Sequence, residues 1–273
     1  MILLSKRILF KVMELVMNDN NLEKILKESY EIQINDITKN SDSTDGNVYL
    51  IESENSKYIF KIYDNFEHTQ SMINLHNFLN ENNFYVPKII PTKNKEYYKK
   101  YDDNYIVMYS FLEGSQLKDI IQTVDNKTIS KLAKEIRRMH DLTDDLSLNL
   151  NTINFNIVKE FERKSILHFD LTKDNIFINK DKIGFIDFDD AKFGPSIYDV
   201  AITISLLFLS KNRGAGLDKV KIFIESYYEN DIQNKEIELP YIKNIALKWI
   251  DYLLTKNSFD TSTKESFEVK KKL

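Results

Sequence analysis

The sequence of 273 residues contains no cysteine, six glycines, four prolines and four histidines. The lack of cysteine excludes disulfide bonds, thiolate nucleophiles and zinc-thiolate sites. The histidines are too far apart in the sequence for the spacing that is typical of zinc ligands (His68, His76, His140 and His168). We therefore expect neither a zinc enzyme nor a protein stabilised by disulfide bonds.

The sequence also lacks an excess of positive charge and a long hydrophobic run. It has 38 basic and 42 acidic residues, a net charge of −4, so no strongly basic surface is available to bind nucleic acid. Its longest uncharged apolar stretch beyond the N-terminal segment, Val200–Ser210, is far shorter than the roughly 20 residues that span a bilayer. Lys11 and Glu14 interrupt the apolar residues near the N-terminus, which argues against a signal peptide. We expect a cytoplasmic protein that binds neither nucleic acid nor a membrane.

The pattern of apolar residues divides the chain into three regions. Residues 1–29 are predicted to form an N-terminal helical extension. Residues 30–110 mostly alternate apolar and polar residues, which predicts strands, interrupted by one segment with helical spacing around Leu75. Residues 111–273 are mainly helical in pattern, with predicted helix breaks at glycines and at Pro240. The predicted fold class is α+β, with a small antiparallel sheet and one helix in an N-lobe and a larger, mainly helical C-lobe.

Polar side chains that could take part in catalysis or bind a metal lie around a predicted hairpin in the C-lobe. Asp170 and Asn175 stand five residues apart in one loop, and Asp187 ends the second hairpin strand. Because a hairpin brings its two ends together, we expect Asp187 to lie near Asn175. One amide oxygen and one carboxylate suit a Mg²⁺ ion that takes its remaining ligands from water and nucleotide phosphate. Asp170 would be left to accept a proton from a hydroxyl group.

These residues resemble the aminoglycoside phosphotransferase and choline kinase group of small-molecule kinases, which has a bilobal protein-kinase-like fold. The group's pattern is H-x-D-x4-N, followed by I-D-[FW]-x-D-A and then Y-D-[LV]-A. The matching residues are His168, Asp170 and Asn175; Ile186, Asp187, Phe188, Asp190 and Ala191; and Tyr198, Asp199, Val200 and Ala201. Weaker matches extend the resemblance to roughly residues 31–201.

The resemblance implies a role for each matched residue. Asp170 corresponds to the catalytic base, and Asn175 and Asp187 correspond to the Mg²⁺ ligands. Lys61, on the predicted third strand, corresponds to the lysine that holds the α- and β-phosphates of the nucleotide. His168 and Asp199 correspond to residues that support the catalytic loop.

The same resemblance places the nucleotide. A loop that includes Ser43 and Gly46 would cover the phosphates with its backbone N–H groups. Backbone groups of Ser110 and Leu112 would bind the purine. In this fold a helix glutamate usually pairs with the strand lysine, but this chain has Met72 at the position where we align that acid.

Alternative interpretations remain for several of these residues. Lys61 could be a solvated lysine at a strand edge, and Asp187 could simply cap a turn. Trp249 and Tyr252 are three residues apart on a predicted helix, where core packing competes with a cation-binding box. His140 ends an apolar helical stripe and is expected to be a packed core histidine.

The predicted function is transfer of the γ-phosphoryl group of ATP or GTP, with Mg²⁺, to a hydroxyl group of a small molecule. The sequence leaves the acceptor open between an aminoglycoside-like antibiotic, a sugar, an amino alcohol and homoserine. One alternative is a catalytically silent nucleotide-binding regulatory module. A kinase acting on proteins is disfavoured because the interval between Asp187 and Asp199 is too short for a long peptide-docking loop.

Overall fold

The computed structural model describes residues 19–39, 47–144, 146, 148, 150–153, 164–208, 216 and 218–255. These residues form two compact units. The first contains the described residues up to Asn77 together with Pro87–Phe111, and the second contains Phe78–Val86 and the described residues from Leu112 onward. Among the described residues, no helix is both long and apolar enough to cross a membrane.

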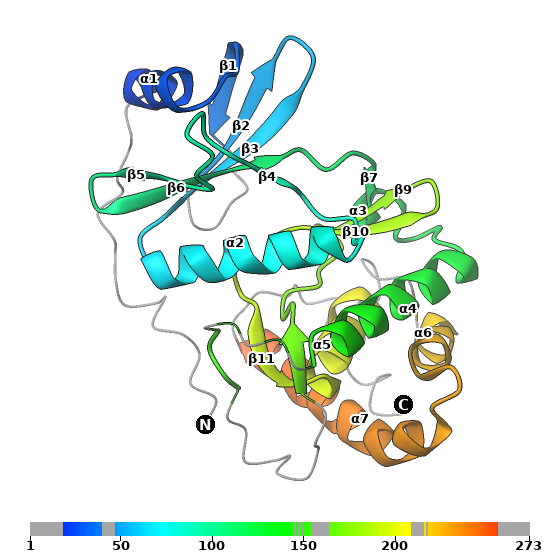
Figure 1. Cartoon of the computed structure of the whole chain (residues 1–273). Coiled ribbons are helices and arrows are strands. Elements are labelled where there is room, and N and C mark those ends of the chain that lie inside the picture. The colour runs from blue at the N-terminus through cyan, green and yellow to red at the C-terminus, as the bar shows by residue number, and fades with distance from the viewer. Residues whose placement is uncertain are drawn as a thin grey trace. The chain divides into compact units, whose positions relative to one another are not determined.

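The first unit is built on an antiparallel sheet of six strands, drawn in blue to green in Figure 1. The main path of the sheet has the order β1-β2-β3-β6-β4, and β5 also pairs with β6. The strands are β1 (Ile34–Lys39), β2 (Val48–Ser53), β3 (Lys57–Tyr63), β4 (Ile89–Ile90), β5 (Lys99–Tyr101) and β6 (Asn104–Ser110). Strand β3 therefore lies in the interior of the sheet, between β2 and β6.

Helix α1 (Asp19–Ser29) packs its apolar side chains on one face of this sheet. Leu22, Leu26 and Tyr30 are buried in a cluster with Phe60 of β3 and Met108 of β6. Successive side chains of a strand point to opposite faces, so the neighbour of Phe60, Lys61, belongs to the other face. The alternation predicted for this strand is thus present.

The second unit is mainly helical and carries two small sheets. The helices are α3 (Leu117–Ile120), α4 (Asn126–Leu142), α5 (Ile197–Leu207), α6 (Asp218–Tyr228) and α7 (Ile232–Thr255), and helix α2 (Phe66–Glu81) begins in the first unit and ends in the second. Strands β7 (Ser115–Gln116), β9 (Ile176–Asn179) and β10 (Lys182–Phe185) form one sheet, and β8 (Lys164–Leu167) pairs with β11 (Lys192–Pro195). Almost every residue of α5 is buried, and this helix packs against α7 while α4 packs against α6.

The predicted α+β class and the mainly helical second part are confirmed, with differences in detail. The break expected at Pro240 is wrong, because Pro240 lies inside α7. Both Pro240 and Glu236, whose carbonyl loses its helical partner, are exposed, so water can bind that carbonyl and the helix continues. Strands β7 and β11 were not predicted, since β7 has only two residues and β11 contains Gly194 and Pro195 in place of an apolar run. The part of the predicted extension that precedes Asp19 lies outside the described residues.

Candidate active site

The predicted hairpin is present as the antiparallel pair β9 and β10. At its open end the backbone N–H of Ile186 donates to the carbonyl of Asn175, with 3.0 Å between nitrogen and oxygen. Asp187 follows directly in the chain. The hairpin thus brings Asn175 and Asp187, twelve positions apart in the sequence, to one place.

Asp170 is tied to Asn175 across the loop that precedes the hairpin. The side-chain nitrogen of Asn175 donates to the carbonyl and to the carboxylate of Asp170, at 2.9 Å in each case. The backbone N–H of Thr172 also donates to the Asp170 carbonyl, at 2.8 Å. Because the amide nitrogen of Asn175 is hydrogen-bonded to Asp170, the amide oxygen is the atom with which this side chain could bind a cation.

The surroundings of Asp170 stabilise its neutral form relative to that of an aspartate in water. Burial, followed by the nearby carboxylates of Asp190 and Asp187, raises the pKa of Asp170 to about 7, while the hydrogen bond from Asn175 opposes the rise. A carboxylate whose pKa lies near neutral pH suits a general base, because proton transfer is then close to balanced.

Two residues of the site have left-handed backbone conformations that side chains other than glycine rarely adopt. The φ angle is 67° at Phe169 and 65° at Asp187. Such conformations cost on the order of 1–3 kcal/mol and persist only where the surroundings fix them. The ring of Phe169 has the Lys192 ammonium 3.8 Å from its centre, and its centroid lies 5.8 Å from that of Trp249. Left-handed backbone thus occurs at the residue before Asp170 and at Asp187 itself, as it does at five other described non-glycine residues of the chain.

The loop that carries Asp170 is held by Asp199, on the buried helix α5. The carboxylate of Asp199 accepts hydrogen bonds from the backbone N–H groups of His168 and Phe169, both at 2.8 Å. Burial alone would raise the pKa of Asp199, yet hydrogen bonds from His140 and from the Phe169 N–H lower it overall. Asp199 is therefore a buried anion that fixes the backbone next to Asp170.

His168 joins this loop to the end of the hairpin. Its Nε2 lies 2.9 Å from the carbonyl of Ile186, and since a carbonyl only accepts, Nε2 carries the proton. Burial lowers the pKa of His168, which keeps the ring neutral. His168 and Asp199 thus both act on the backbone, as predicted for supports of the loop.

The donor set fits a divalent cation that is shared with a nucleotide. Among the described residues no group of three or more histidine, aspartate or glutamate side chains forms a closed metal cage. Asn175 offers one amide oxygen, and the Asp187 side chain is exposed, with the Asp190 carboxylate close enough to act on Asp170. Mg²⁺ commonly uses one or two protein oxygens and completes its shell with water and phosphate, so these residues suit that ion.

Lys61 lies on the central strand β3 of the first unit, paired with Val48 on one side and Val107 on the other. Its side chain is half-buried. The interpretation as a strand-edge lysine is therefore wrong, because the strand has neighbours on both sides. Met72 of α2 is buried, so this position contributes to packing.

The structure describes only some of the other residues that were predicted to bind the nucleotide. Ser43 and Gly46 lie outside the described residues. The backbone N–H of Ser110 donates to the Lys88 carbonyl at 2.7 Å, so it already has a partner within the first unit. Leu112 belongs to the second unit and is buried. Their contact with a purine stays a prediction.

Sequence reasoning missed one residue that is connected to this site. Tyr227 of α6 hydrogen-bonds His140, which in turn contacts Asp199. His140 is the buried histidine that was expected, but it is joined to the support of the catalytic loop. Nothing in the sequence could link Tyr227 to Asp170, because the two are separated by 57 positions and share no motif.

A known protein family matches the part of the chain that carries this site. The model of the phosphotransferase enzyme family matches residues 158–222, which include the loop, the hairpin and Asp199 of α5. A curated relative, the KEOPS complex subunit Bud32 of Pyrococcus abyssi (strain GE5 / Orsay), is 24% identical over 104 residues. That match covers 38% of this chain, and the chain spans 39% of the length of the relative.

Solved structures with the same fold cover nearly the whole chain. The amicoumacin kinase hAmiN, solved with AMP-PNP, Ca²⁺ and Ami, has a TM-score of 0.72 at 15% identity over 94% of this chain and 92% of its own. A microcompartment-associated aminopropanol kinase has a TM-score of 0.65 at 14% identity, over 93% and 94% of the two chains. Spectinomycin phosphotransferase, solved with ADP and spectinomycin, has a TM-score of 0.64 at 18% identity, over 93% of each chain. The predicted resemblance and the predicted protein-kinase-like fold are therefore confirmed.

Proposed function

We propose that this protein is a phosphotransferase that moves the γ-phosphoryl group of ATP or GTP to a hydroxyl group of a small molecule. The observation that carries the proposal is the joining of Asp170, Asn175 and Asp187 at one end of the β9–β10 hairpin. The phosphotransferase family match over these residues and the small-molecule kinases among the structural neighbours support it.

Each group at the site has a part in this reaction. Asp170 is held by Asn175 and by the backbone that Asp199 binds, and it accepts the proton of the acceptor hydroxyl. The hydroxyl oxygen forms a bond to the γ-phosphorus, while the bond from this phosphorus to the β,γ-bridging oxygen breaks and the nucleoside diphosphate leaves. The amide oxygen of Asn175 and the carboxylate of Asp187 would hold Mg²⁺, which when bound would supply positive charge that neutralises the phosphates. Lys61 would hold the α- and β-phosphates, and backbone groups near Ser43, Gly46, Ser110 and Leu112 would hold the rest of the nucleotide. Phosphoryl transfer needs mainly positioning and charge neutralisation, which this set provides.

A small hydroxylated acceptor is favoured over a protein. Neighbours of the same fold bear names that point to small acceptors, namely amicoumacin, spectinomycin and aminopropanol. The chain shares with Bud32 only part of its length, so the complex named for that relative carries no argument here. The lack of cysteine and the use of a nucleoside triphosphate support a cytoplasmic location.

The competing function is a catalytically silent nucleotide-binding module. It would explain why a methionine stands where a helix acid is usual, but it gives no reason for retaining a proton acceptor beside two cation ligands. The two functions predict different results in a phosphotransfer assay.

The test is phosphotransfer from ATP and from GTP, each with Mg²⁺, to a panel of aminoglycosides, sugars, amino alcohols and homoserine. We expect one class of acceptor to be phosphorylated by wild type and not by Asp170→Asn. Nucleotide binding without transfer to any acceptor, and without nucleotide hydrolysis, would favour the silent module. Absence of nucleotide binding would contradict both functions.

A further inference from the structure

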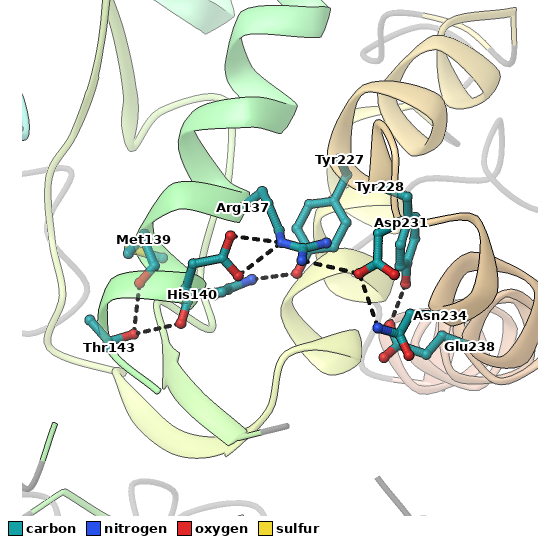
Figure 2. Close-up of polar contacts among 10 residues, drawn as sticks. Arg137, Met139, His140, Thr143, Tyr227, Tyr228, Asp231, Asn234 and Glu238 are labelled. Carbon is teal, nitrogen blue, oxygen red and sulfur yellow. Dashed lines mark hydrogen bonds and ion pairs between the residues drawn. The ribbon is translucent and has the colours of Figure 1, made fainter. Parts of the chain in front are cut away.

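A buried chain of hydrogen bonds runs from helix α6 to the catalytic loop. His140 of α4 is fully buried; its Nδ1 lies 2.7 Å from the Tyr227 hydroxyl, and its Nε2 lies 3.1 Å from the carboxylate of Asp199. Figure 2 shows the contact between His140 and Tyr227. A carboxylate only accepts, so Nε2 carries a proton, and the Tyr227 hydroxyl, which can donate or accept, is the partner of Nδ1.

The same carboxylate continues the chain to the loop. The oxygen of Asp199 that faces His140 also accepts the N–H of His168, and the other oxygen accepts the N–H of Phe169. Phe169, with its strained φ of 67°, directly precedes Asp170. Whatever fixes the Asp199 carboxylate therefore fixes the backbone that carries the proposed base.

The ring of Tyr227 is itself held in place by charged neighbours. The guanidinium of Arg137 lies 5.5 Å from its centroid and is paired with Asp141 at 2.9 Å and with Asp231 at 3.1 Å. Figure 2 shows the pair of Arg137 and Asp231. These residues line a cleft of about 640 Å³ between α4 and α6.

The cleft offers no excess charge to a ligand within the described part of the chain. Its lysine and two arginines each have an acidic partner, in the pairs Lys134–Glu229, Arg137–Asp141, Arg137–Asp231 and Arg138–Glu135. A set of charges that already satisfy one another suits a brace for Tyr227 better than a binding site.

We propose that Tyr227 is a positioning residue for phosphoryl transfer, acting through His140 and Asp199 on the backbone of the catalytic loop. The hydroxyl satisfies the buried Nδ1 of His140, so that the imidazole keeps Nε2 directed at Asp199. Without that hydroxyl, a buried ring nitrogen loses its hydrogen-bond partner, which costs free energy and removes one of the two contacts that fix the orientation of the ring. This inference rests on the proposed function for its effect on rate, but not for its effect on the loop.

The neighbouring Tyr228 provides a matched control. It is also buried on α6, and its hydroxyl donates to the buried Glu238 at 2.5 Å. Its ring lies against that of Tyr227, with centroids 5.0 Å apart, a contact that Tyr228→Phe keeps. Tyr227→Phe and Tyr228→Phe each delete one buried hydroxyl and keep the ring. A purely structural role predicts similar effects of the two variants on activity.

The experiment compares both variants with wild type in two measurements. We expect Tyr227→Phe to lower kcat on the order of tenfold, as small misplacements of reacting groups do, with KM for the nucleotide within about twofold. Tyr228→Phe should lower the free energy of unfolding at least as much as Tyr227→Phe does, but it should keep kcat within about twofold of wild type. In protein without substrate, amide hydrogen exchange of His168 and Phe169 should become faster in Tyr227→Phe only, because their N–H groups report local opening of the loop.

The outcomes separate this inference from the proposed function. Equal losses of kcat in the two variants, or unchanged exchange at His168 and Phe169 in Tyr227→Phe, would overturn the positioning role. If wild type transfers phosphate to no acceptor, the proposed function fails. The exchange comparison still decides in that case whether Tyr227 holds the loop.

Discussion

The side-chain amide of Asn175 donates to both the carbonyl and the carboxylate of Asp170, at 2.9 Å in each case. One residue thus fixes the backbone and the reactive group of the same loop. An asparagine at position 170 presents an oxygen that can accept the same bond, so Asp170→Asn should preserve the loop. The variant therefore isolates the chemistry of the carboxylate from its structural part.

On this basis Asp170→Asn should lower the phosphotransfer rate by about 10²–10⁴-fold, the usual effect of removing a general base. The affinity for nucleotide should remain close to that of wild type, because Asp170 is not assigned to the phosphates. Steady-state kinetics with a nucleotide-binding titration would measure both quantities. Full activity of the variant would remove Asp170 from the mechanism.

The same substitution should make the protein more stable at alkaline pH. The pKa of Asp170 is raised to about 7 in the folded protein and lies near 3.9 when unfolded, so the unfolded state holds fewer protons between these values. Stability from this group is full below about pH 4 and is lost as pH rises through about 7. The variant side chain carries no charge, so without divalent cations we expect Asp170→Asn to exceed wild type on the order of 2 kcal/mol at about pH 8.

Urea unfolding of both proteins at about pH 5 and about pH 8 in EDTA would check this dependence, because other titrating groups cancel in the difference. The difference in unfolding free energy between Asp170→Asn and wild type should be smaller at the lower pH. It should also become smaller when Mg²⁺ and nucleotide are added. A difference that is the same at both pH values would show that the Asp170 carboxylate is not held at a raised pKa.

Lys61→Ala should raise KM for the nucleotide and lower kcat, since the phosphates lose a positioned charge. Lys57, on the same strand, is exposed and paired with Glu52, and Lys57→Ala is the matched control. Kinetics at varied nucleotide concentration would separate the two variants. Equal behaviour of both would leave Lys61 without a role in nucleotide binding.

Asp187→Ala should remove most of the Mg²⁺-dependent part of nucleotide binding. For wild type, ATP or GTP with Mg²⁺ at about 100-fold above Kd should stabilise the fold by roughly 2.7 kcal/mol. That corresponds to a rise in Tm on the order of 5 °C, larger than the rise with nucleotide or Mg²⁺ alone. Thermal-shift titration of wild type and variant would measure the synergy. An unchanged synergy in Asp187→Ala would direct the metal assignment to Asp189 and Asp190.

Gly184→Ala should destabilise the second unit by about 2 kcal/mol, the usual cost of overpacking. A Cβ atom at position 184 would lie 2.6 Å from the ring of Tyr85 and 2.8 Å from its carbonyl oxygen, and backbone cannot move aside easily. Gly194→Ala is the control, since the atoms nearest to its Cβ would be those of the Ile153 side chain, at 3.2 Å and beyond. Tm should fall by several degrees more for Gly184→Ala. Equal Tm values would show that the segment around Tyr85 can adjust.

The parts of the site that sequence could predict are those that depend on local order in the chain. The hairpin was predictable because its apolar runs and its polar ends follow one another within a short stretch, and so was the meeting of Asn175 and Asp187. The alternation that places Phe60 in the core and Lys61 on the opposite face was also visible, because a strand has a fixed period of two.

The parts that sequence could not predict depend on contacts between distant segments. The pKa of Asp170 is set by burial and by carboxylates from a later turn, and no pattern reports either quantity. The helix continues through Pro240 because that turn happens to face solvent. The link from Tyr227 to Asp199 requires the packing of α6 against α4.

The short segment Phe78–Val86 has a consequence for how the chain is made. It belongs to the second unit: Arg138 of α4 lies 3.9 Å above the ring of Phe84 and donates to the Asn82 carbonyl, and Tyr85 pairs with Gly184. A ribosome that has completed the first unit at Phe111 must add 73 residues before Gly184 is made, about 4–15 s at usual speeds. Until Arg138 is made, the buried Phe84 lacks this partner, and until Gly184 is made, Tyr85 lacks its own, so a nascent chain stalled before Arg138 should be open to protease and chaperone at this segment.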